Sequence, residues 1–269
     1  MSEARMSEAR MSEPTAVDDL GTAPGVAPKD VRRVVSLVPS LTESVAVTAP
    51  GLLVGATDWC THPGDLDVAR IGGTKNPRVD AIVALAPDLV LANDEENRAP
   101  DIEAMRAAGL DVWVTSPQTL AEAFGSLGRM LAACGLDRPM WLDDARRVWS
   151  NTYDDSAPVH LAAVPIWRRP WMVLGSQTFA GDVLRQLGIG NIFGSHPERY
   201  PKIGIDEIRS SGADLVVLPD EPYAFSADDG PEEFRGLATR LVSGRHLMWY
   251  GPSLVEARDV LEGQLAGQV

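Results

Sequence analysis

The chain has 269 residues, which is more than most single hydrophobic cores hold, so two lobes are expected. Hydrophobic residues make up 45% and charged residues 23%, a composition typical of a folded soluble protein, and no apolar run is long enough for a transmembrane helix. A net charge of −14 excludes nucleic acid and anionic membrane surfaces as expected partners, because both would repel the chain.

The first thirty residues predict a disordered leader over 1–30. MSEAR occurs at positions 1 and 6, a shortened copy follows at position 11, and small residues and prolines come next. The segment has neither the apolar core of a secretion signal nor a cysteine for a lipid anchor. The chain as written is therefore expected in the cytoplasm, and its two cysteines, Cys60 and Cys134, are too few for a disulfide framework.

Residues 31–134 predict a first α/β lobe. Apolar, β-branched runs bounded by turn residues predict strands within 32–40, 52–58, 89–93 and 111–116. Helices are predicted over 41–49, 79–87 and 100–108, and a further one begins at Thr119. Ser40 with Glu43 and Thr119 with Glu122 have the spacing of capping boxes that open two of these helices.

A linking helix between the two lobes is predicted within 135–157. Asp137 can cap it, Pro139 lies in its first turn, and apolar residues recur at helical spacing from Trp141 to about Tyr153. At about 1.5 Å per residue, about 16 residues give a length of about 24 Å, which is enough to bridge two lobes.

Residues 158–269 predict a second α/β lobe. Strands are expected within 159–167, 171–175, 215–219 and 246–250, and helices near 181–187, near 206–211 and after Ser253. Residues 79–90 align without a gap on residues 205–216, and each copy is a short helix feeding a parallel strand. Chance similarity of two βαβ units is the alternative, but an offset of 126 residues, almost half the chain, favours two related lobes. The predicted fold is therefore α/β, with two Rossmann-like lobes joined by a single backbone α-helix.

Several segments, taken in order, resemble the periplasmic cobalamin-binding protein family. They are residues 35–43, 55–63, 71–77, 79–92 and 205–216, and the resemblance runs from about Arg32 to the C-terminus. The family belongs to the class III substrate-binding proteins of ABC transporters for cobalamin, iron–siderophores and haem, also called helical-backbone metal receptors. The resemblance implies two lobes joined by one helix, with the ligand in the cleft between them and little domain closure, and family members are normally exported.

The resemblance also implies a contact with an ABC permease. The family's pair of acidic residues that dock onto basic permease residues falls on Asp80 and Asp206, where the family usually has Glu. As an alternative, both are helix N-terminal acids that the helix dipole favours.

Loops at the carboxyl ends of the predicted strands are the candidate ligand-binding positions. The candidate residues are Ser40, Trp59, Thr74, Lys75, Asn76, Asn93, Tyr200 and Trp249. Trp59, Tyr200 and Trp249 offer flat apolar area for stacking on a macrocycle, and core packing is the alternative for each. The resemblance puts Tyr200 where cobalamin binders carry Trp. Thr74 and Asn93 stand where the most similar cobalamin receptor has Trp, so the expected cleft is more polar.

Charged and metal-binding residue types in these loops leave alternatives open. Lys75 and Asn76 can pair with a phosphate or carboxylate of the ligand, or with the acidic run 93–97. That run is either a solvated helix N-terminus or a recognition element for a cationic or amine-bearing ligand. Cys60 and His62 supply two soft metal ligands, but no third ligand is identified nearby, so no metal site and no cofactor are predicted.

The expected function is non-catalytic binding of a small molecule, with a corrinoid or a metal–siderophore complex as candidate ligand and an ABC permease as candidate partner. The sequence contains no GxGxxG, Walker A, GxSxG or HExxH motif, and its four histidines are scattered without ligand spacing. The rival hypothesis is an intracellular enzyme or cofactor-handling protein of corrinoid or tetrapyrrole metabolism that uses the same fold.

Overall fold

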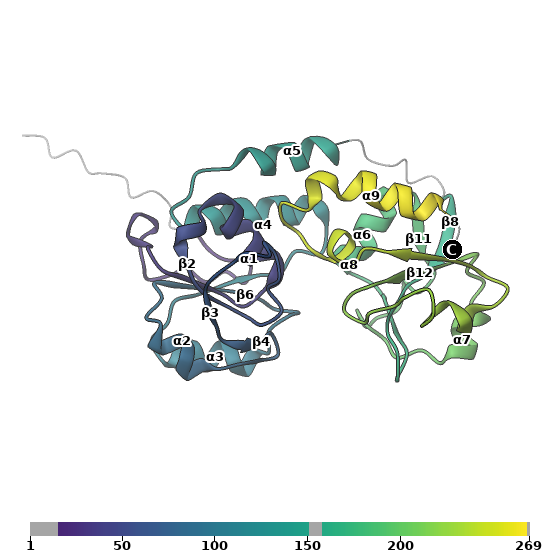
Figure 1. Cartoon of the computed structure of the whole chain (residues 1–269), viewed down its shortest axis with the longest axis horizontal. Helices are drawn as coiled ribbons and strands as arrows, with labels where there is room; N and C mark the ends of the chain where they lie inside the picture. The colour runs from purple at the N-terminus through teal and green to yellow at the C-terminus, as the bar shows by residue number, and fades with distance from the viewer. Residues whose placement is uncertain (1–15, 151–157, 268–269) are drawn as a thin grey trace, which may run out of the picture.

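The computed structural model describes residues 16–150 and 158–267, which form two α/β lobes lying side by side (Figure 1). Within these residues, the first lobe is built on a sheet with the strand order β3-β2-β1-β6-β7, and its strand pairs are parallel. The strands are β1 (Val34–Ser36), β2 (Leu53–Ala56), β3 (Ala69–Arg70), β6 (Leu89–Asn93) and β7 (Val112–Thr115). All of β6 is buried, because helices cover both faces of the sheet.

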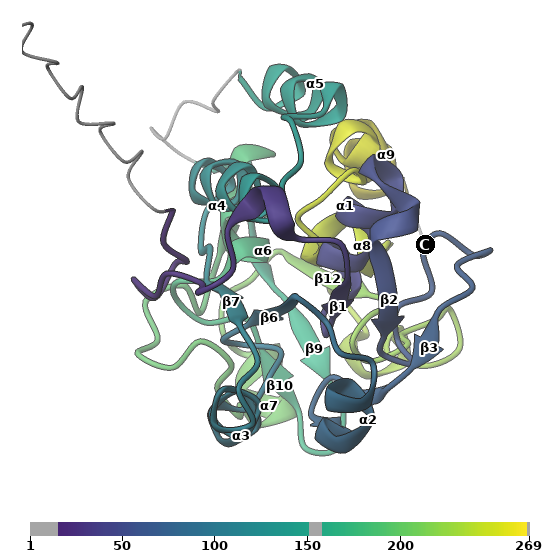
Figure 2. The same ribbon diagram turned by 90° about the vertical axis from the view of Figure 1, so that its left-hand side faces the viewer.

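The helices of the first lobe are α1 (Pro39–Thr48) and α4 (Leu120–Ala133) on one face of the sheet, and α2 (Val79–Ala84) and α3 (Ala99–Ala107) on the other (Figures 1 and 2). The capping box predicted at Thr119 opens α4, since Thr119 and Glu122 exchange side-chain and backbone hydrogen bonds. The box predicted at Ser40 and Glu43 is wrong. Helix α1 already begins at Pro39, and both residues lie buried inside it. An antiparallel hairpin of β4 (Gly72–Gly73) and β5 (Asn76–Pro77) precedes α2.

Residues 16–30 pack along the outer edge of the first sheet, so the leader predicted over 1–30 is too long. The buried Asp18 carboxylate accepts hydrogen bonds from three backbone N–H groups, among them that of Val114 in β7 at 3.1 Å. Asp19 accepts the Ser116 N–H at 2.7 Å. The segment therefore covers part of β7, an edge strand of the sheet. Apolar periodicity could not predict this packing, because short acidic side chains make these contacts. Residues 1–15 lie outside the described part of the chain.

In the described part of the second lobe, a parallel sheet has the strand order β11-β8-β12-β13. Its strands are β8 (His160–Ala163), β11 (Ile189–Asn191), β12 (Leu215–Pro219) and β13 (Ala238–Val242), and an antiparallel hairpin of β9 (Pro165–Trp167) and β10 (Met172–Val173) follows β8. The helices are α6 (Phe179–Gln186), α7 (Ile205–Arg209), α8 (Gly244–Met248) and α9 (Leu254–Ala266). The strand predicted within 246–250 is wrong, because residues 246–248 belong to α8. Strand β13 completes the sheet instead, and its mostly half-exposed residues form no apolar run.

Helix α5 (Met140–Val148) follows the first lobe in sequence and contacts both lobes (Figure 1). Trp141 Nε1 donates to Thr48 Oγ1 of α1 at 3.0 Å, and Trp149 Nε1 donates to the Leu254 carbonyl of α9 at 2.9 Å. The helix is shorter than the one predicted to about Tyr153, and residues 151–157 fall outside the described residues.

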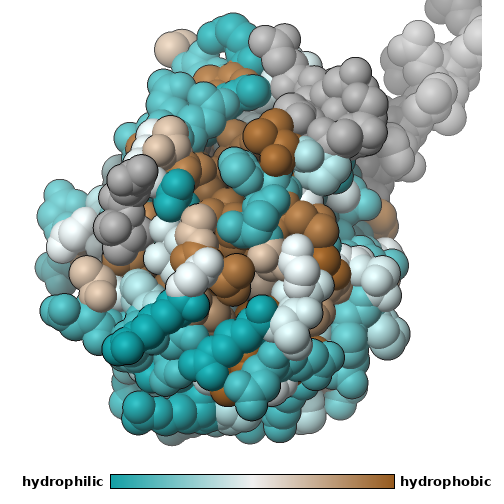
Figure 3. All heavy atoms as spheres, turned by 90° about the vertical axis from the view of Figure 1, so that its right-hand side faces the viewer, coloured by the Kyte–Doolittle hydropathy of each residue, from teal (hydrophilic) through white to brown (hydrophobic). Residues whose placement is uncertain are grey.

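An apolar cluster runs through both lobes. It contains Leu91 and Leu131 of the first lobe, Leu174 and Leu215 of the second, and Trp149 next to α5. Packed side chains therefore join the lobes, which favours a fixed relative orientation. At the exposed end of the second lobe, apolar residues gather near the centre of the face and polar residues surround them (Figure 3). None of the helices in the described ranges is both long and apolar enough to cross a membrane.

Candidate functional site

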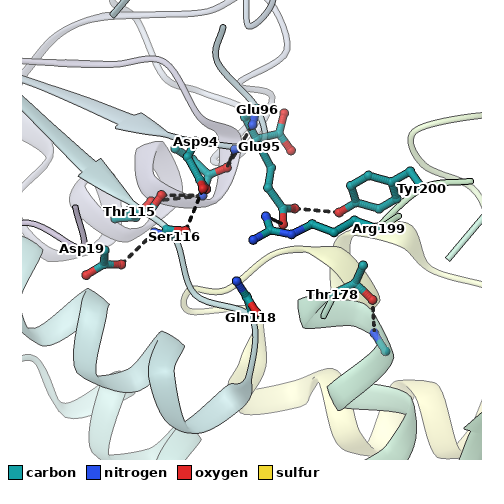
Figure 4. Close-up of polar contacts among 12 residues, drawn as sticks. Asp19, Asp94, Glu95, Glu96, Thr115, Ser116, Gln118, Thr178, Arg199 and Tyr200 are labelled. Atoms are coloured by element: carbon teal, nitrogen blue, oxygen red, sulfur yellow. Dashed lines mark hydrogen bonds and ion pairs between the residues drawn. The ribbon is translucent and has the colours of Figure 1, made fainter. Parts of the chain in front are cut away.

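Side chains from both lobes converge at the carboxyl end of β6 (Figure 4). The acidic loop 94–96 follows this strand, and Glu95 points from it towards Arg199 and Tyr200 of the second lobe. Loops at the carboxyl ends of parallel strands are the usual ligand-contacting positions in α/β proteins. We call this region the interlobe junction, and its members are residues 93–96 of the first lobe and Arg199, Tyr200, Glu221 and Trp249 of the second.

Asn93, the last residue of β6, holds the acidic loop in place. Its Oδ1 accepts the backbone N–H groups of Glu95 and Glu96, both at 2.9 Å, and its Nδ2 donates to the Tyr250 hydroxyl at 2.8 Å. The residue is only 4% exposed. Asn93, a sequence-predicted ligand contact, thus lies beneath the loop, fixes its turn and ties it to the second lobe.

Glu95 bridges the lobes directly. Its Oε2 accepts the Tyr200 hydroxyl at 2.6 Å, and its Oε1 pairs with Arg199 Nη1. Burial, followed by the charge of Glu95, raises the pKa of the Tyr200 phenol, so Tyr200 is a neutral donor at neutral pH. Lys75 Nζ donates to the Glu95 backbone carbonyl, so the turn between β4 and β5 also supports the acidic loop.

Glu96 and Glu221 bring two further carboxylates to the junction from opposite lobes. Glu221 follows β12, and its Oε2 accepts the Trp249 indole N–H at 2.9 Å. Burial raises the pKa of Glu221, and the charges of Asp220 and Glu96 raise it further. Glu96 is an exposed residue. The protein around its carboxylate removes part of its solvation and so raises its pKa, whereas the charge of Lys75 lowers it.

Trp249 and Tyr200, two of the three predicted stacking residues, lie at the junction. Trp249 is 7% exposed, and His62 of the first lobe meets its ring edge-on, with 5.4 Å between the ring centroids. Trp59 is 66% exposed and faces Gly73 of β4. Trp59 therefore lies beside the hairpin that supports the acidic loop, and among the described residues no aromatic ring stacks on it.

The remaining candidates divide into buried and accessible residues. Ser40 is buried inside α1, where its carbonyl accepts the Ser44 hydroxyl at 2.8 Å, so its side chain presents no surface to a ligand. The Thr74 carbonyl accepts Asn97 Nδ2 at 2.9 Å, which ties the β4–β5 turn to the acidic loop. Asn76 is exposed in β5.

Two members of the junction, Arg199 and Glu221, were not among the sequence-predicted residues. Glu221 lies two residues beyond the predicted strand 215–219, so the strand-end rule that selected Asn93 could have found it. Arg199 is recognised only through its partner Glu95, which lies 104 residues away in the chain. No spacing rule predicts a contact of that range.

Cys60 and His62 have separate surroundings. The buried Cys60 thiol contacts the hydroxyls of Thr42 at 3.0 Å and Thr57 at 3.1 Å, and burial raises its pKa. His62 faces Trp249 instead. In the described ranges, no group of three or more His, Cys, Asp or Glu side chains is arranged to hold a metal ion.

Asp80 and Asp206 lie in the first turns of α2 and α7, which are on the same side of the molecule (Figures 1 and 2). Both are exposed, and Asp206 pairs with Arg209 of its own helix at 3.2 Å. Because each aspartate lies in the first turn of its helix, the helix dipole favours its negative charge. No side chain caps either helix.

No protein-family model matches the chain. Among proteins of related sequence, the ABC transporter substrate-binding lipoprotein YvrC of Bacillus subtilis is 30% identical over 129 residues, which cover 46% of this chain and 41% of that protein. The vitamin B12-binding protein of Vibrio parahaemolyticus is 21% identical over 214 residues, which cover 76% of each chain. The named relatives are thus solute-binding proteins rather than enzymes.

Solved structures show the same architecture. CeuE of Helicobacter pylori with Ni(II) bound has a TM-score of 0.77 at 15% identity, covering 94% of this chain and 89% of that chain. The periplasmic haem-binding protein BhuT in complex with two haems has a TM-score of 0.67 at 20% identity, covering 87% and 97%. The fold is therefore that of the two-lobed solute-binding proteins. The chain has the fold of the class III periplasmic binding proteins, as its resemblance to the cobalamin-binding family implied.

Proposed function

We propose that this chain is the ligand-binding component of an ABC transporter and that it binds a corrinoid or a metal–siderophore complex at the interlobe junction. The observation that carries this proposal is the meeting of Glu95 with Arg199 and Tyr200, because it brings polar side chains of both lobes to the carboxyl end of a parallel sheet. The names of the relatives, which include vitamin B12-binding and haem-binding proteins, support a large metal-containing ligand.

The residues at the junction suit such a ligand. Trp249, Tyr200 and His62 provide flat rings whose edges carry polar atoms, so they can contact a macrocycle without exact hydrogen-bond registry. Trp59, Lys75 and Asn76 are exposed on the first lobe and can extend the contact. We propose that three of the predicted residues support the site without contacting the ligand. Asn93 holds the acidic loop, Thr74 ties the β4–β5 turn to that loop, and Ser40 is buried in α1.

The proposed transport role gives Asp80 and Asp206 a partner. Each lies exposed on a different lobe and on one side of the molecule, so a permease with two basic positions can pair with both at once. Transport also places the chain outside the cytoplasmic membrane, in place of the cytoplasmic location expected from the sequence as written. Cell fractionation followed by immunoblotting distinguishes the two compartments.

A thermal-shift panel tests the proposed ligand class. We expect cyanocobalamin, aquacobalamin or a ferric hydroxamate siderophore to raise the melting temperature, because a ligand that binds only the folded state stabilises it by about 2.7 kcal/mol at 100 times its Kd. Haemin, which carries two propionates, is included as an anionic comparison ligand. A folded protein that no corrinoid and no siderophore complex stabilises or binds in calorimetry contradicts the proposed function.

A further inference from the structure

His62 presents an imidazole with one unengaged nitrogen at the boundary between the lobes. It lies in the loop 57–62 that follows β2, at the carboxyl end of the first sheet, and its ring meets Trp249 of the second lobe edge-on, with 5.4 Å between the ring centroids. Its Nδ1 lies 3.2 Å from the Thr61 hydroxyl, whereas no group among the described residues makes a hydrogen bond with its Nε2. The residue is partly exposed.

The contact with Thr61 suits an imidazole that coordinates a metal. A neutral imidazole has one N–H and one nitrogen lone pair, and the partner of one nitrogen decides which of the two the other nitrogen presents. The Thr61 hydroxyl can accept a hydrogen bond from Nδ1–H of His62, which leaves the lone pair on Nε2. Metal-ligating histidines are usually oriented in this way, by an oxygen atom at the nitrogen that does not bind the metal.

The other three histidines lack this combination of a free nitrogen and a place at the junction. Nδ1 of His196 accepts the Glu198 backbone N–H at 3.1 Å, so the proton of its neutral ring is on Nε2. His246 has hydrogen-bond partners at both ring nitrogens. His160 is the first residue of β8 and therefore lies at the amino end of its strand, away from the carboxyl ends that meet at the junction.

The loop that carries His62 is held from below by Cys60 and Arg70. Arg70 Nη1 donates to the carbonyls of Thr57 and Cys60, at 2.9 and 2.8 Å. The buried Cys60 thiol contacts the hydroxyls of Thr42 and Thr57, and burial raises its pKa. Of the two soft metal ligands in this loop, Cys60 is thus engaged in packing, and His62 is the one that a ligand can reach.

A single imidazole cannot hold a free metal ion, but it can complete the coordination of a metal that a ligand already holds. Building on the proposed function, we propose that His62 Nε2 coordinates the cobalt of a bound corrinoid, and that the site prefers corrinoids whose upper axial position is exchangeable. In aquacobalamin, the Nε2 lone pair forms the new bond to Co(III) and the bound water leaves with its own electron pair, so no atom is oxidised or reduced. A ferric trihydroxamate offers no such position, because its oxygen atoms fill the coordination sphere of the iron.

Two corrinoids that differ at the upper axial position test this proposal. Aquacobalamin holds water there, which imidazole displaces, whereas cyanocobalamin holds cyanide, which imidazole does not displace. Aquacobalamin bound to the protein should show the visible absorption spectrum of aquacobalamin mixed with free imidazole. Cyanocobalamin should bind with its spectrum unchanged.

Variants locate the bond to the metal. We expect His62→Ala to abolish the spectral change and to raise the Kd of aquacobalamin in calorimetry about 10- to 100-fold, with a change of less than about threefold for cyanocobalamin. His62→Gln, which keeps a polar side chain without an imidazole, should behave in the same way. His160→Ala removes a histidine at the far end of the second lobe and should leave both spectrum and Kd intact. Circular dichroism confirms that each variant is folded.

The outcomes separate this proposal from the function on which it rests. A spectral change that persists in both His62 variants assigns the bond to another group and overturns the proposal. Binding of aquacobalamin without a spectral change, or binding of a ferric hydroxamate alone, also overturns it and leaves the proposed function standing. If no corrinoid and no siderophore complex binds the folded protein, the proposed function fails and the proposal fails with it.

Discussion

Asn93 shows at the scale of a single residue how the candidate site is held. Its side chain makes hydrogen bonds to two backbone N–H groups of the acidic loop, to the Thr115 carbonyl and to the Tyr250 hydroxyl. The side chain is buried, so water cannot replace these partners without rearrangement. The position of Glu95 and Glu96 therefore depends on a residue that presents almost no surface of its own.

We expect Asn93→Ala to lower the free energy of unfolding by about 2 to 4 kcal/mol, since it leaves several buried donors and acceptors unpaired. Urea denaturation followed by circular dichroism measures the change. Asn76→Ala is the control, because Asn76 is exposed, and it should change stability by about 0.5 kcal/mol or less. Equal effects of the two substitutions would refute the structural role of Asn93.

Glu221 gives a pH dependence at the same scale. Its pKa is raised by burial, so between the unfolded and folded pKa values the folded chain binds more protons than the unfolded chain. Stability then falls as pH rises through that window. Glu221→Gln lacks this loss and can still accept the Trp249 N–H. We expect the variant to gain stability relative to wild type as pH rises from about 4 to about 7.

The measurement is urea denaturation of both proteins across this pH range. Asp229, Glu232 and Glu256, whose pKa values are lowered in the folded chain, contribute the opposite trend, in which stability is lost as pH falls. Both proteins share that trend, so it cancels in their difference. A difference between variant and wild type that stays constant with pH would contradict the prediction.

At the scale of elements, the segment 16–30 closes the edge of β7 through buried acids. Asp18→Ala removes the acceptor of three backbone N–H groups and the partner of Arg106, which lies 3.6 Å away. We expect a loss of about 2 to 4 kcal/mol of unfolding free energy. Asp30→Ala, at an exposed position of the same segment, is the control and should change stability little. A loss that is the same for both variants would mean that the segment does not stabilise the sheet.

Helix α5 depends on the tryptophan at its end. Trp149 is 6% exposed, donates to the Leu254 carbonyl and lies beneath Arg258. Trp149→Ala should cost about 3 to 5 kcal/mol, the usual range for a buried aromatic residue. Met140→Ala, at the 81% exposed start of the helix, should cost little. Chemical denaturation of both variants gives the comparison, and a mild effect of Trp149→Ala would show that α5 adds little to the junction of the lobes.

Sequence patterns predicted the elements unevenly, and the physical reason is burial. Strands such as β6 and β12 are buried along their whole length and stand out as apolar runs. Strand β13 lies at a sheet edge with mostly half-exposed residues, so its sequence has no such run. Side-chain spacing identified the capping box at Thr119 correctly and the one at Ser40 incorrectly, because Glu43 instead pairs with Arg245 of the other lobe.

The candidate site was predictable where it follows from strand ends and not where it follows from contacts between lobes. Asn93 was selected at the end of a predicted strand, and it lies at the junction as the last residue of β6. Tyr200 and Trp249 also lie there, but Trp249 follows α8, where the sequence predicted a strand. The second-lobe partners of Glu95, Arg199 and Tyr200, are more than 100 residues distant, so spacing contains no information on them. Charge at the junction emerges only when both lobes are in place.

At the scale of the whole molecule, Glu95 of the first lobe joins the two lobes through its contacts with Arg199 and Tyr200 of the second. We expect Glu95→Gln to accelerate hydrogen exchange of backbone amides in both partner segments, residues 94–97 and 199–201, because the ion pair with Arg199 is lost. Helices α4 and α9, within the shared apolar cluster, should keep their protection. Glu103→Gln, on an exposed position of α3, provides the charge control. Faster exchange in the first-lobe segment alone would show that the contact does not couple the lobes.

The apolar cluster shared by the lobes limits how far the lobes can move when a ligand binds. It therefore limits how a partner protein could distinguish the ligand-bound molecule from the ligand-free one. Pulling the lobes apart would divide this cluster and expose apolar side chains to water, and that cost opposes wide opening. The overall outline should therefore be nearly the same with and without ligand. A permease that docks on Asp80 and Asp206, as proposed, then has little change in their spacing to detect. If the ligand binds at the interlobe junction as proposed, a partner has to detect it through local rearrangement of side chains there, first of all Arg199, Glu95 and Tyr200.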